Sequence, residues 1–245
     1  MGRSVIFQDL GKVSYEETWE YQQKLFDHAV EIKRYNRKHT DEEMKEQKHY
    51  LLFCEHPPVY TIGRSGKIDH LLLDEKGLKA EGIEFFKINR GGDITYHGPG
   101  QLVAYPIFDL DYFFTDVHRY VRTLEEVVIR SLADFGIVGQ REKGYTGVWL
   151  EGNDAQPKRK ICAIGVHLSR WVSMHGFALN VNSNLSHFNH IVPCGIAAED
   201  KSVTSMQQEL GSTVDMEEIK TSVKKQFAML FEFEYENIAQ RNSTH

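Results

Sequence analysis

At residues 90–101 the chain reads Arg90-Gly91-Gly92-Asp93-Ile94-Thr95-Tyr96-His97-Gly98-Pro99-Gly100-Gln101, with four glycines in twelve residues. The spacing is neither Gly-x-Gly-x-x-Gly between a strand and a helix nor a Walker loop that ends in Gly-Lys-Ser/Thr. It therefore does not predict a dinucleotide or nucleoside triphosphate site. Glycines in this density allow the backbone to approach an elongated ligand closely. The alternative interpretation is a pair of tight turns around a short strand.

Short apolar runs on both sides of this segment predict a mixed sheet. Glycine and proline residues separate the runs, as where His56-Pro57-Pro58 divides two of them. Because the runs do not alternate strictly with helices, they favour an α+β domain. Strands are expected at residues 4–9, 50–55, 59–62, 85–89, 94–96, 102–108, 145–150, 160–168 and 173–181.

Four helices are expected around these strands. Ser14-Tyr15-Glu16-Glu17 forms a capping box for a helix that continues to about residue 35. Thr115 is expected to cap a second helix, which closes at Gly136. The other two helices are expected at residues 202–210 and from Asp215 onward.

The bulk properties are those of a globular protein. The 245 residues are 41% hydrophobic and 26% charged, which suits a sizeable core. No apolar run approaches the roughly 20 residues that span a bilayer. The first residues also lack the apolar centre of a secretory signal, so neither membrane insertion nor export is expected.

Charge and potential metal ligands argue against several further function classes. The formal net charge of −6 argues against a general nucleic-acid-binding surface, although Lys158-Arg159-Lys160 is a candidate basic patch. Three cysteines without a short-spaced pair favour reduced thiols and a cytoplasmic location. The twelve histidines make no His-Glu-x-x-His motif and there is no Cys-x-x-Cys pair, so no metal site is expected.

A cysteine and a lysine are the candidates for chemistry. Cys194 lies in the stretch His190-Ile191-Val192-Pro193-Cys194-Gly195-Ile196, where proline and glycine are expected to hold it on a tight turn. Lys160 begins the apolar run 161–166 and there can be partly desolvated. If the two side chains meet, they form a thiolate nucleophile with its base, which is the machinery of acyl transfer. The alternatives are a buried core cysteine and a solvated surface lysine.

Five segments of the chain, taken in order, resemble the motifs of the lipoyl(octanoyl) transferase family. The resemblance covers roughly residues 50 to 210 and leaves out the polar stretch 36–48 and the tail after about Tyr235. The stretch 36–48 is read either as a helix extension or as a solvated loop. The five segments are Glu55-His56-Pro57-Pro58-Val59-Tyr60-Thr61-Ile62-Gly63-Arg64, the segment 90–101 quoted above, Lys160-Ile161-Cys162-Ala163-Ile164-Gly165, His175-Gly176-Phe177-Ala178-Leu179-Asn180 and Pro193-Cys194-Gly195-Ile196.

The resemblance implies a biotin/lipoyl protein ligase type of fold, with a mixed sheet flanked by helices in a single catalytic domain over residues 1–245. It implies that Cys194 carries an acyl thioester and that Lys160 lowers the pKa of its thiol. It also implies three groups of residues that line an acyl pocket. These are Arg90, Gly91, Gly92, Asp93, Ile94, Thr95, Tyr96 and His97, then Ala163, Ile164 and Gly165, then Gly176, Phe177 and Ala178.

Some pocket residues have a more specific expected role. Val103, Ile164 and Phe177 are candidates for the apolar slot that would hold an aliphatic chain. His97 is a candidate to bind or orient the acyl carbonyl. The alternative for His97 is a hydrogen bond to a neighbouring loop.

The reaction implied by the resemblance moves an octanoyl group from octanoyl-acyl carrier protein to a lysine of a lipoyl domain, the first step of lipoate assembly. The acceptors would be the lipoyl domains of 2-oxoacid dehydrogenase E2 subunits and the glycine cleavage H protein. Neither ATP nor another cofactor is expected, and neither nucleic acid nor a membrane is an expected partner. Two alternatives are an ATP-using lipoate or biotin ligase of the same fold, and a non-catalytic module that binds carrier or lipoyl domains.

Overall fold

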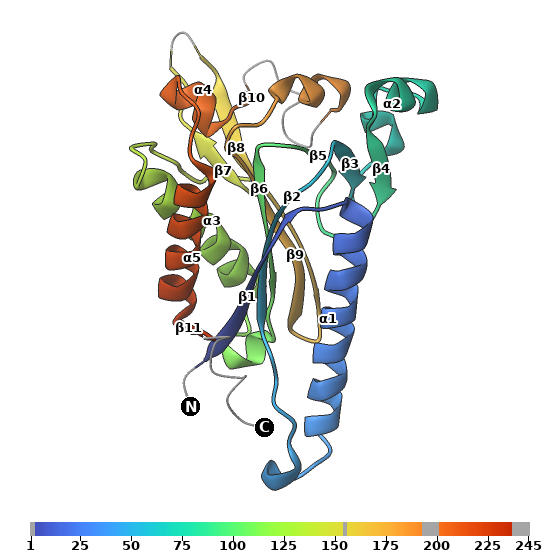
Figure 1. Ribbon diagram of the computed structural model, residues 1–245, viewed down its shortest axis with the longest axis vertical. Helices are drawn as coiled ribbons and strands as arrows, with labels where there is room; N and C mark the ends of the chain where they lie inside the picture. Colours follow the sequence, from blue (N-terminus) through green and yellow to red (C-terminus); the bar gives the residue numbers. More distant parts are fainter. Residues whose placement is uncertain (1–2, 154–155, 193–200, 237–245) are drawn as a thin grey trace.

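A large mixed sheet forms the centre of the computed structural model, which describes residues 3–153, 156–192 and 201–236 (Figure 1). Strand β6 is antiparallel to both neighbours, β2 and β9, whereas β1 runs parallel to β2. Among the described residues the strand order is β10 (Lys201–Val203), β8 (Lys158–Ser169), β9 (Val172–Asn180), β6 (Gln101–Ile107), β2 (Tyr50–Glu55), β1 (Ser4–Lys12) and β11 (Glu234–Tyr235), with β7 (Val148–Leu150) paired to β8.

A second, smaller sheet lies beside one end of the large one. Its strands are β4 (Glu84–Lys87), β3 (Val59–Ile62) and β5 (Ile94–His97), with β3 in the middle. Strands β2 and β3 are consecutive in the chain, and the segment 56–58 leads from the large sheet into the small one. The segment 90–101 likewise passes from the small sheet, through β5, to the start of β6. These two crossings bring the ends of both sheets together.

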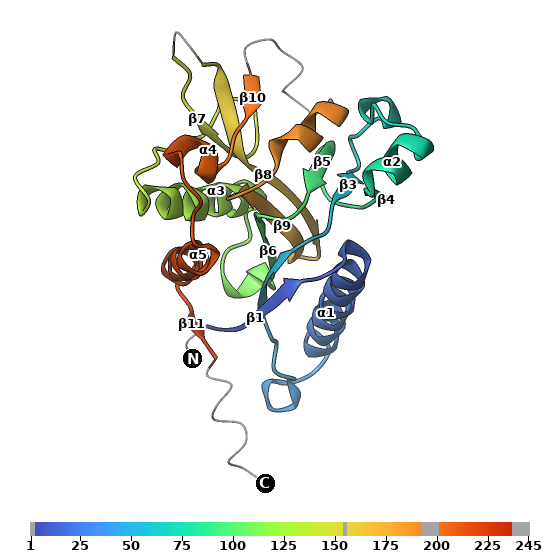
Figure 2. The same ribbon diagram turned by 45° about the horizontal axis from the view of Figure 1, so that its top comes forward.

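Helices cover both faces of the large sheet (Figures 1 and 2). Helix α1 (Tyr15–Asn36) packs on β9 and β6 from one side, and α3 (Val117–Ala133) packs with α5 (Met216–Phe231) on the other. The remaining helices are short. They are α2 (Glu75–Glu81), α4 (Met206–Leu210) and the 3-10 turns Asp41–Glu43, Ile68–His70, Leu110–Tyr112 and Leu185–His190.

Strand β2 shows how one strand fills the two cores. Leu51 and Phe53 pack in the cluster that contains the α3 and α5 side chains, whereas Leu52 and Cys54 pack with Phe26 of α1. Successive side chains of a strand point to opposite faces, so a strand covered on both sides is apolar at every position. All four residues are fully buried. Burial on both faces of β2 explains why residues 51–54 are a continuous apolar run in the sequence.

The α+β class, with a mixed sheet flanked by helices, is confirmed. The predicted starts of α3 and α4 were wrong, whereas the loop predicted as one of two alternatives for the stretch 36–48 is confirmed. Asp116, not Thr115, caps α3, because its carboxylate accepts the N–H of Arg119 at 2.9 Å. Residues 202–203 belong to β10, and α4 begins at Met206. The stretch 36–48 is a loop with one 3-10 turn, tied down where the Asn36 amide bonds the backbone of Lys45.

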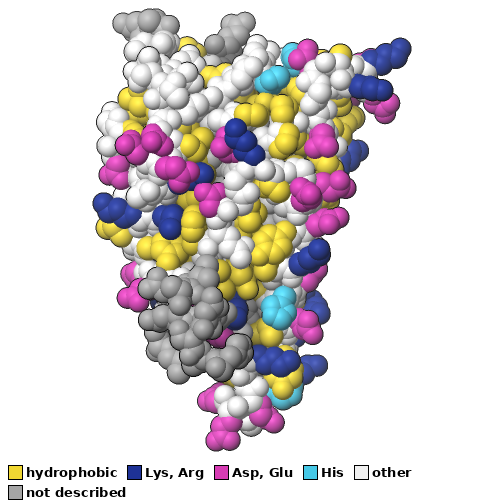
Figure 3. Space-filling model, viewed as in Figure 1, with side chains coloured by type: hydrophobic (Ala, Val, Ile, Leu, Met, Phe, Trp, Pro, Cys, Tyr) yellow, Lys and Arg dark blue, Asp and Glu magenta, His cyan; other side chains and the backbone are white. Residues whose placement is uncertain are grey.

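One face of the molecule is mixed in charge. On the face seen in Figure 3, Lys and Arg side chains are interspersed with Asp and Glu side chains. None of the helices in the described part of the chain combines the length and apolar character that crossing a bilayer requires.

The cap of α3 gives a direct test of the corrected helix start. Asp116→Ala is expected to lower the free energy of unfolding by about 1 kcal/mol, because the N–H of Arg119 loses its acceptor. Thr115→Ala, at an exposed position outside the helix, is the matched control and should change it by less than about 0.5 kcal/mol. Urea denaturation of both variants measures the difference. A larger loss in Thr115→Ala than in Asp116→Ala would show that the helix begins where the sequence alone suggested.

Candidate active site

A pocket of about 250 Å³ opens where β5, β6, β8 and β9 come together. It gathers residues from all three groups predicted to line an acyl site, and Val103 of the expected apolar slot lies on its wall. Lys160 lines the same pocket, so the candidate base and the candidate acyl slot share one cavity. The predicted residues on the wall are Arg90, Gly92, Asp93, Ile94, Thr95, His97, Lys160, Ala163, Ile164, Gly165, Gly176, Phe177 and Ala178.

The hairpin of β8 and β9 carries two of these groups. They are neighbours because the antiparallel register places them directly opposite one another. Segments that the chain separates by about ten residues therefore form one continuous piece of pocket wall. The register pairs are Ala163 with Ala178, Ile164 with Phe177 and Gly165 with Gly176.

The paired glycines allow other backbone segments to come close. A Cβ atom on Gly176 would lie 2.1 Å from the carbonyl oxygen of Ala104 in β6, and one on Gly165 would lie 2.8 Å from the carbonyl oxygen of Gly91. Both distances are shorter than atoms tolerate. Glycine at both positions thus lets β6 and the 90–92 turn close around the pocket.

The Arg90 side chain holds the 90–92 turn against the small sheet. Its guanidinium donates from Nη2 to the carbonyl and hydroxyl oxygens of Thr61, at 2.7 and 3.0 Å, and from Nη1 to the carbonyl of Gly91 at 3.0 Å. The side chain is buried, and this burial lowers the pKa of Arg90. These neutral oxygens bind both terminal nitrogens of a buried cation on the pocket wall, whereas its Nε has no hydrogen-bond partner among the described residues.

Two residues of the predicted groups are not on the pocket wall. Gly91 instead donates its N–H to the carbonyl of Val166 at 2.9 Å and so joins the turn to β8. Tyr96 is buried in the core of the small sheet, where its ring contacts Tyr60 and Phe188. Gly91 and Tyr96 therefore stabilise the segments that carry the pocket residues, without lining the pocket themselves.

His97 is neutral, and its hydrogen bonds fix which nitrogen carries the proton. The Gln101 amide donates from Nε2 to two oxygens, so its Oε1, 2.8 Å from His97 Nδ1, must be an acceptor. His97 Nδ1 is therefore protonated and Nε2 carries a lone pair. Burial, followed by the nearby His56, lowers the pKa of His97 to about 3. A ring that can only accept at Nε2 does not suit the expected hydrogen bond to an acyl carbonyl.

Lys160 lies over an aromatic ring. Its Nζ is 4.8 Å from the centroid of Trp149, the residue opposite it in the β7–β8 register. Trp149 is fully buried. A cation at this distance from an indole face is stabilised by the quadrupole of the ring, most strongly where water is excluded. The Lys160 side chain therefore has a defined seat on the pocket wall.

The two basic residues before Lys160 do not form an open basic patch. Lys158 Nζ lies 2.8 Å from a carboxylate oxygen of Glu142, and Arg159 Nε lies 2.7 Å from one of Glu209. Their charge is largely balanced locally. The predicted basic patch at 158–160 is therefore not present as such: Lys158 and Arg159 each form an ion pair, and Lys160 lines the pocket.

The candidate nucleophile Cys194 lies outside the residues that the structure describes, and its assignment stays a prediction. The two described cysteines, Cys54 and Cys162, are fully buried. Burial raises the pKa of both thiols, so neither is ionised at neutral pH. Among the described residues no group of three or more His, Cys, Asp or Glu side chains is arranged to hold a metal ion.

Sequence analysis missed pocket residues that tertiary packing supplies. Tyr15, in the first turn of α1, stacks on the ring of His97 with 5.9 Å between centroids and 11° between planes. His175 lines the pocket with a φ of 59°, and its Nε2 lies 2.8 Å from Oδ1 of Asn89. His175 was inside a quoted motif, which could have signalled it. Nothing local marked Tyr15 except the cap that begins its helix.

Comparison with known proteins agrees with this architecture. An octanoyltransferase from Cytophaga hutchinsonii is 53% identical over 235 residues, which cover 96% of each chain. An octanoyltransferase from Flavobacterium johnsoniae is 54% identical over 235 residues, covering 96% of this chain and 99% of the relative. A bipartite lipoate protein ligase from Thermoplasma acidophilum, studied with its E2 lipoyl domain, shares the fold with a TM-score of 0.66 at 16% identity, covering 97% of this chain and 86% of that one.

The expected ligase-like fold is confirmed by this likeness, and the family resemblance by the two close relatives. A family model described as the lipoyl protein ligase A/B catalytic domain matches residues 14–228. The match includes the β8–β9 hairpin and every predicted pocket residue. The chain therefore belongs to the lipoyl protein ligase A/B catalytic-domain family.

Proposed function

We propose that this protein transfers an octanoyl group from octanoyl-acyl carrier protein to a specific lysine of lipoyl domains, through a thioester on Cys194. The observation that carries the proposal is one pocket whose wall combines the apolar side chains of Val103, Ile164 and Phe177 with Lys160. Support comes from relatives named octanoyltransferase at 53% and 54% identity over nearly the whole chain. The whole chain, residues 1–245, is proposed to act as a single catalytic domain.

The apolar part of the pocket suits an aliphatic chain. Val103, Ile164 and Phe177 contribute hydrophobic surface from three strands. At about 0.8 kcal/mol per buried CH₂ group, an octanoyl chain gains several kcal/mol from such a slot. This gain is enough to separate an octanoyl group from much shorter acyl groups.

In the first half-reaction the Cys194 thiolate attacks the carbonyl carbon of the donor thioester. A new carbon–sulfur bond forms on the enzyme and the donor's carbon–sulfur bond breaks. The carrier leaves as a thiolate with the electron pair and takes up the proton that Lys160 received from Cys194, so that Lys160 is neutral again for the second half-reaction. Both the attacking and the leaving groups are sulfur, so the exchange is nearly neutral in free energy. The donor is already activated, which is why ATP is not required.

In the second half-reaction the ε-amine of the acceptor lysine attacks the enzyme thioester. The amide bond forms, the Cys194 carbon–sulfur bond breaks, and the amine gives up a proton. Lys160 is the proposed acceptor of that proton, and of the thiol proton in the first step. As a cation it would instead hold the thiolate by charge, and the two groups would titrate together. Backbone N–H groups of the glycine-rich turns are the proposed donors to the tetrahedral oxyanion.

The proposed acceptors are the lipoyl domains of 2-oxoacid dehydrogenase E2 subunits and the glycine cleavage H protein. Support for a lipoyl-domain acceptor comes from the Thermoplasma ligase, which was studied with an E2 lipoyl domain. We also propose a cytoplasmic location, which the three cysteines without a short-spaced pair favour.

One assay separates this proposal from its two alternatives. The protein is given octanoyl-acyl carrier protein and a lipoyl domain without ATP, or free octanoate with ATP and Mg²⁺. Octanoylation of the lipoyl domain only in the first mixture supports the transferase. Product only in the second mixture identifies a ligase, and binding without product in either mixture identifies a non-catalytic module.

Replacing the proposed nucleophile should abolish transfer. In Cys194→Ser the hydroxyl is similar in size to the thiol, but a lysine cannot ionise it appreciably, so octanoylation of the lipoyl domain should fall at least about 1000-fold. Cys162→Ser is the matched control, since that thiol is buried and protonated, and it should keep a substantial part of the activity. Mass spectrometry of the lipoyl domain measures both. Near-normal turnover in Cys194→Ser would rule out the covalent route.

Replacing the proposed base should separate its two roles. Lys160→Ala should return the Cys194 thiol toward a pKa of about 8.5, so that its alkylation by iodoacetamide at pH 7 slows. Lys160→Arg keeps the positive charge but cannot accept a proton at neutral pH. It should therefore preserve fast alkylation while losing turnover. Superimposable alkylation profiles for wild type and Lys160→Ala, read from the Cys194 peptide across pH 5 to 10, would show that the two residues do not communicate.

A further inference from the structure

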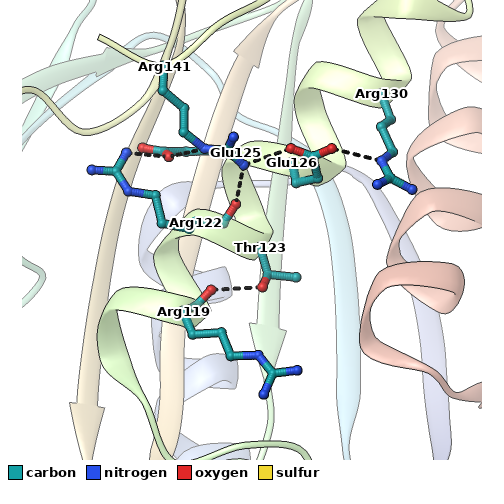
Figure 4. Close-up of polar contacts among 7 residues, drawn as sticks. All are labelled: Arg119, Arg122, Thr123, Glu125, Glu126, Arg130 and Arg141. Atoms are coloured by element: carbon teal, nitrogen blue, oxygen red, sulfur yellow. Dashed lines mark hydrogen bonds and ion pairs between the residues drawn. The ribbon is translucent and has the colours of Figure 1, made fainter. Parts of the chain in front are cut away.

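A buried carboxylate on α3 is held by two arginines (Figure 4). Glu125 has no exposed surface, and its Oε2 lies 2.6 Å from Nη1 of Arg122 and 3.1 Å from Nε of Arg141. Arg141 also donates from Nη2 to the carbonyl of Arg122 at 3.0 Å and to Oε2 of Glu126 at 2.7 Å. The arginines are partly exposed and close over the carboxylate, so one of its oxygens is fully engaged.

The other oxygen of Glu125 bonds the backbone just after the pocket-lining residues 144–146. Oε1 accepts the backbone N–H of Gly147 at 3.1 Å. Gly147 has a φ of 119°, in the region that favours glycine. A Cβ atom there would lie 3.4 Å from Cε of Lys160 and 2.5 Å from the carbonyl oxygen of Cys162. A side chain at Gly147 would therefore meet the Lys160 stem, so the residue whose N–H Glu125 holds lies beside that stem.

The residues on both sides of Gly147 belong to the pocket region that contains Lys160. Residues 144–146, just before it, line the pocket. Trp149, two residues after it, carries the ring over which the Lys160 ammonium lies. The β7–β8 pairing is irregular between Val148 and Trp149, so the strand register alone does not dictate where this segment lies. A hydrogen bond from Gly147 to a fixed carboxylate supplies the missing constraint.

The burial of Glu125 also needs an explanation beyond stability. Removing a carboxylate from water is costly, and well-packed apolar groups in place of a buried ion pair are often as stable or more so. Such a pair fixes the positions of the charged groups. Here the fixed carboxylate of Glu125 holds the N–H of Gly147, which lies beside Lys160.

We propose that Glu125, held by Arg122 and Arg141, is a positioning residue for Lys160 and acts through Gly147 and Trp149. The proposal rests on the proposed function of Lys160 as the base of acyl transfer. Glu125 itself touches neither substrate nor the reacting atoms. Its carboxylate suits the role because it accepts on both sides, from the arginines and from Gly147, whereas a glutamine has only one acceptor atom.

The test compares two isosteric changes of buried carboxylates. Glu125→Gln is expected to lower kcat for octanoyl transfer about 10- to 100-fold, with little change in KM for the donor, because a small displacement of a reacting group is enough for such a loss. Asp109→Asn is the matched control. Asp109 is also buried and paired, with Nζ of Lys33 at 2.5 Å, but it does not line the pocket, and its variant should keep kcat within about 3-fold.

The NMR signals of Lys160 can be measured without any enzymatic activity. They separate a specific displacement of Lys160 from a general loosening of the fold. The ¹³Cε and ¹Hε signals of Lys160, assigned by their absence from Lys160→Arg, should be displaced by the ring of Trp149 in the wild type. In Glu125→Gln they should move toward those of a solvated lysine, and in Asp109→Asn they should stay. If Glu125→Gln does not fold, Arg141→Met, which leaves Glu125 paired with Arg122, should give a smaller change in the same direction.

The outcomes distinguish this inference from the proposed function. Unmoved Lys160 signals in Glu125→Gln, or equal losses of kcat in Glu125→Gln and Asp109→Asn, would overturn the positioning role even in an active transferase. If the Lys160 signals move in Glu125→Gln but the wild type transfers no octanoyl group, the positioning of Lys160 by Glu125 would stand and the proposed reaction would be wrong.

Discussion

The candidate site depends on how closely β8 and β9 pair with their neighbours. Gly165 and Gly176 face each other across the hairpin, and at each position a methyl group would collide with a carbonyl oxygen. Because neither residue has a side chain, β6 and the turn at 90–92 approach from both sides and enclose a pocket of about 250 Å³. The side chains of Val103, Ile164 and Phe177 supply apolar surface within this pocket. A wider separation would open the pocket to water.

Arg90 and Lys160 are the basic residues on the described wall of this pocket, and its histidines are neutral. His97 and His175 are both uncharged at neutral pH, because burial lowers the pKa of each to about 3. The basic residues beside the pocket, Lys158 and Arg159, are paired with glutamates. Lys160 lies on the Trp149 ring, with Nζ 4.8 Å from its centroid, and shares the pocket wall with the Arg90 guanidinium. Such an environment suits a group that must act on a thiol and an amine in turn.

How much of this could be predicted from sequence depends on the range of the forces involved. Strands β2 and β3 begin and end as predicted, because a doubly buried apolar run and the His56-Pro57-Pro58 break are local signals. The predicted N-cap of α3 was wrong by one residue, because threonine and aspartate are both favoured at this position and Thr115 and Asp116 are neighbours. Glu125 was not singled out from the sequence, because only the tertiary structure brings it to Gly147. The site residues were predicted from the order of the motifs. Tyr15 could not be predicted in this way, because it reaches the pocket only through the packing of α1, which no local pattern encodes.

The most direct test of the account is to trap the acyl-enzyme. The protein is exposed to octanoyl-acyl carrier protein, then digested and analysed by mass spectrometry before and after a lipoyl domain is added. The account predicts one octanoyl group on the peptide that contains Cys194, labile to neutral hydroxylamine as a thioester is, and lost when the lipoyl domain becomes octanoylated. An octanoyl group on any other residue, or transfer to the lipoyl domain with no adduct on Cys194 under single-turnover conditions, would contradict it.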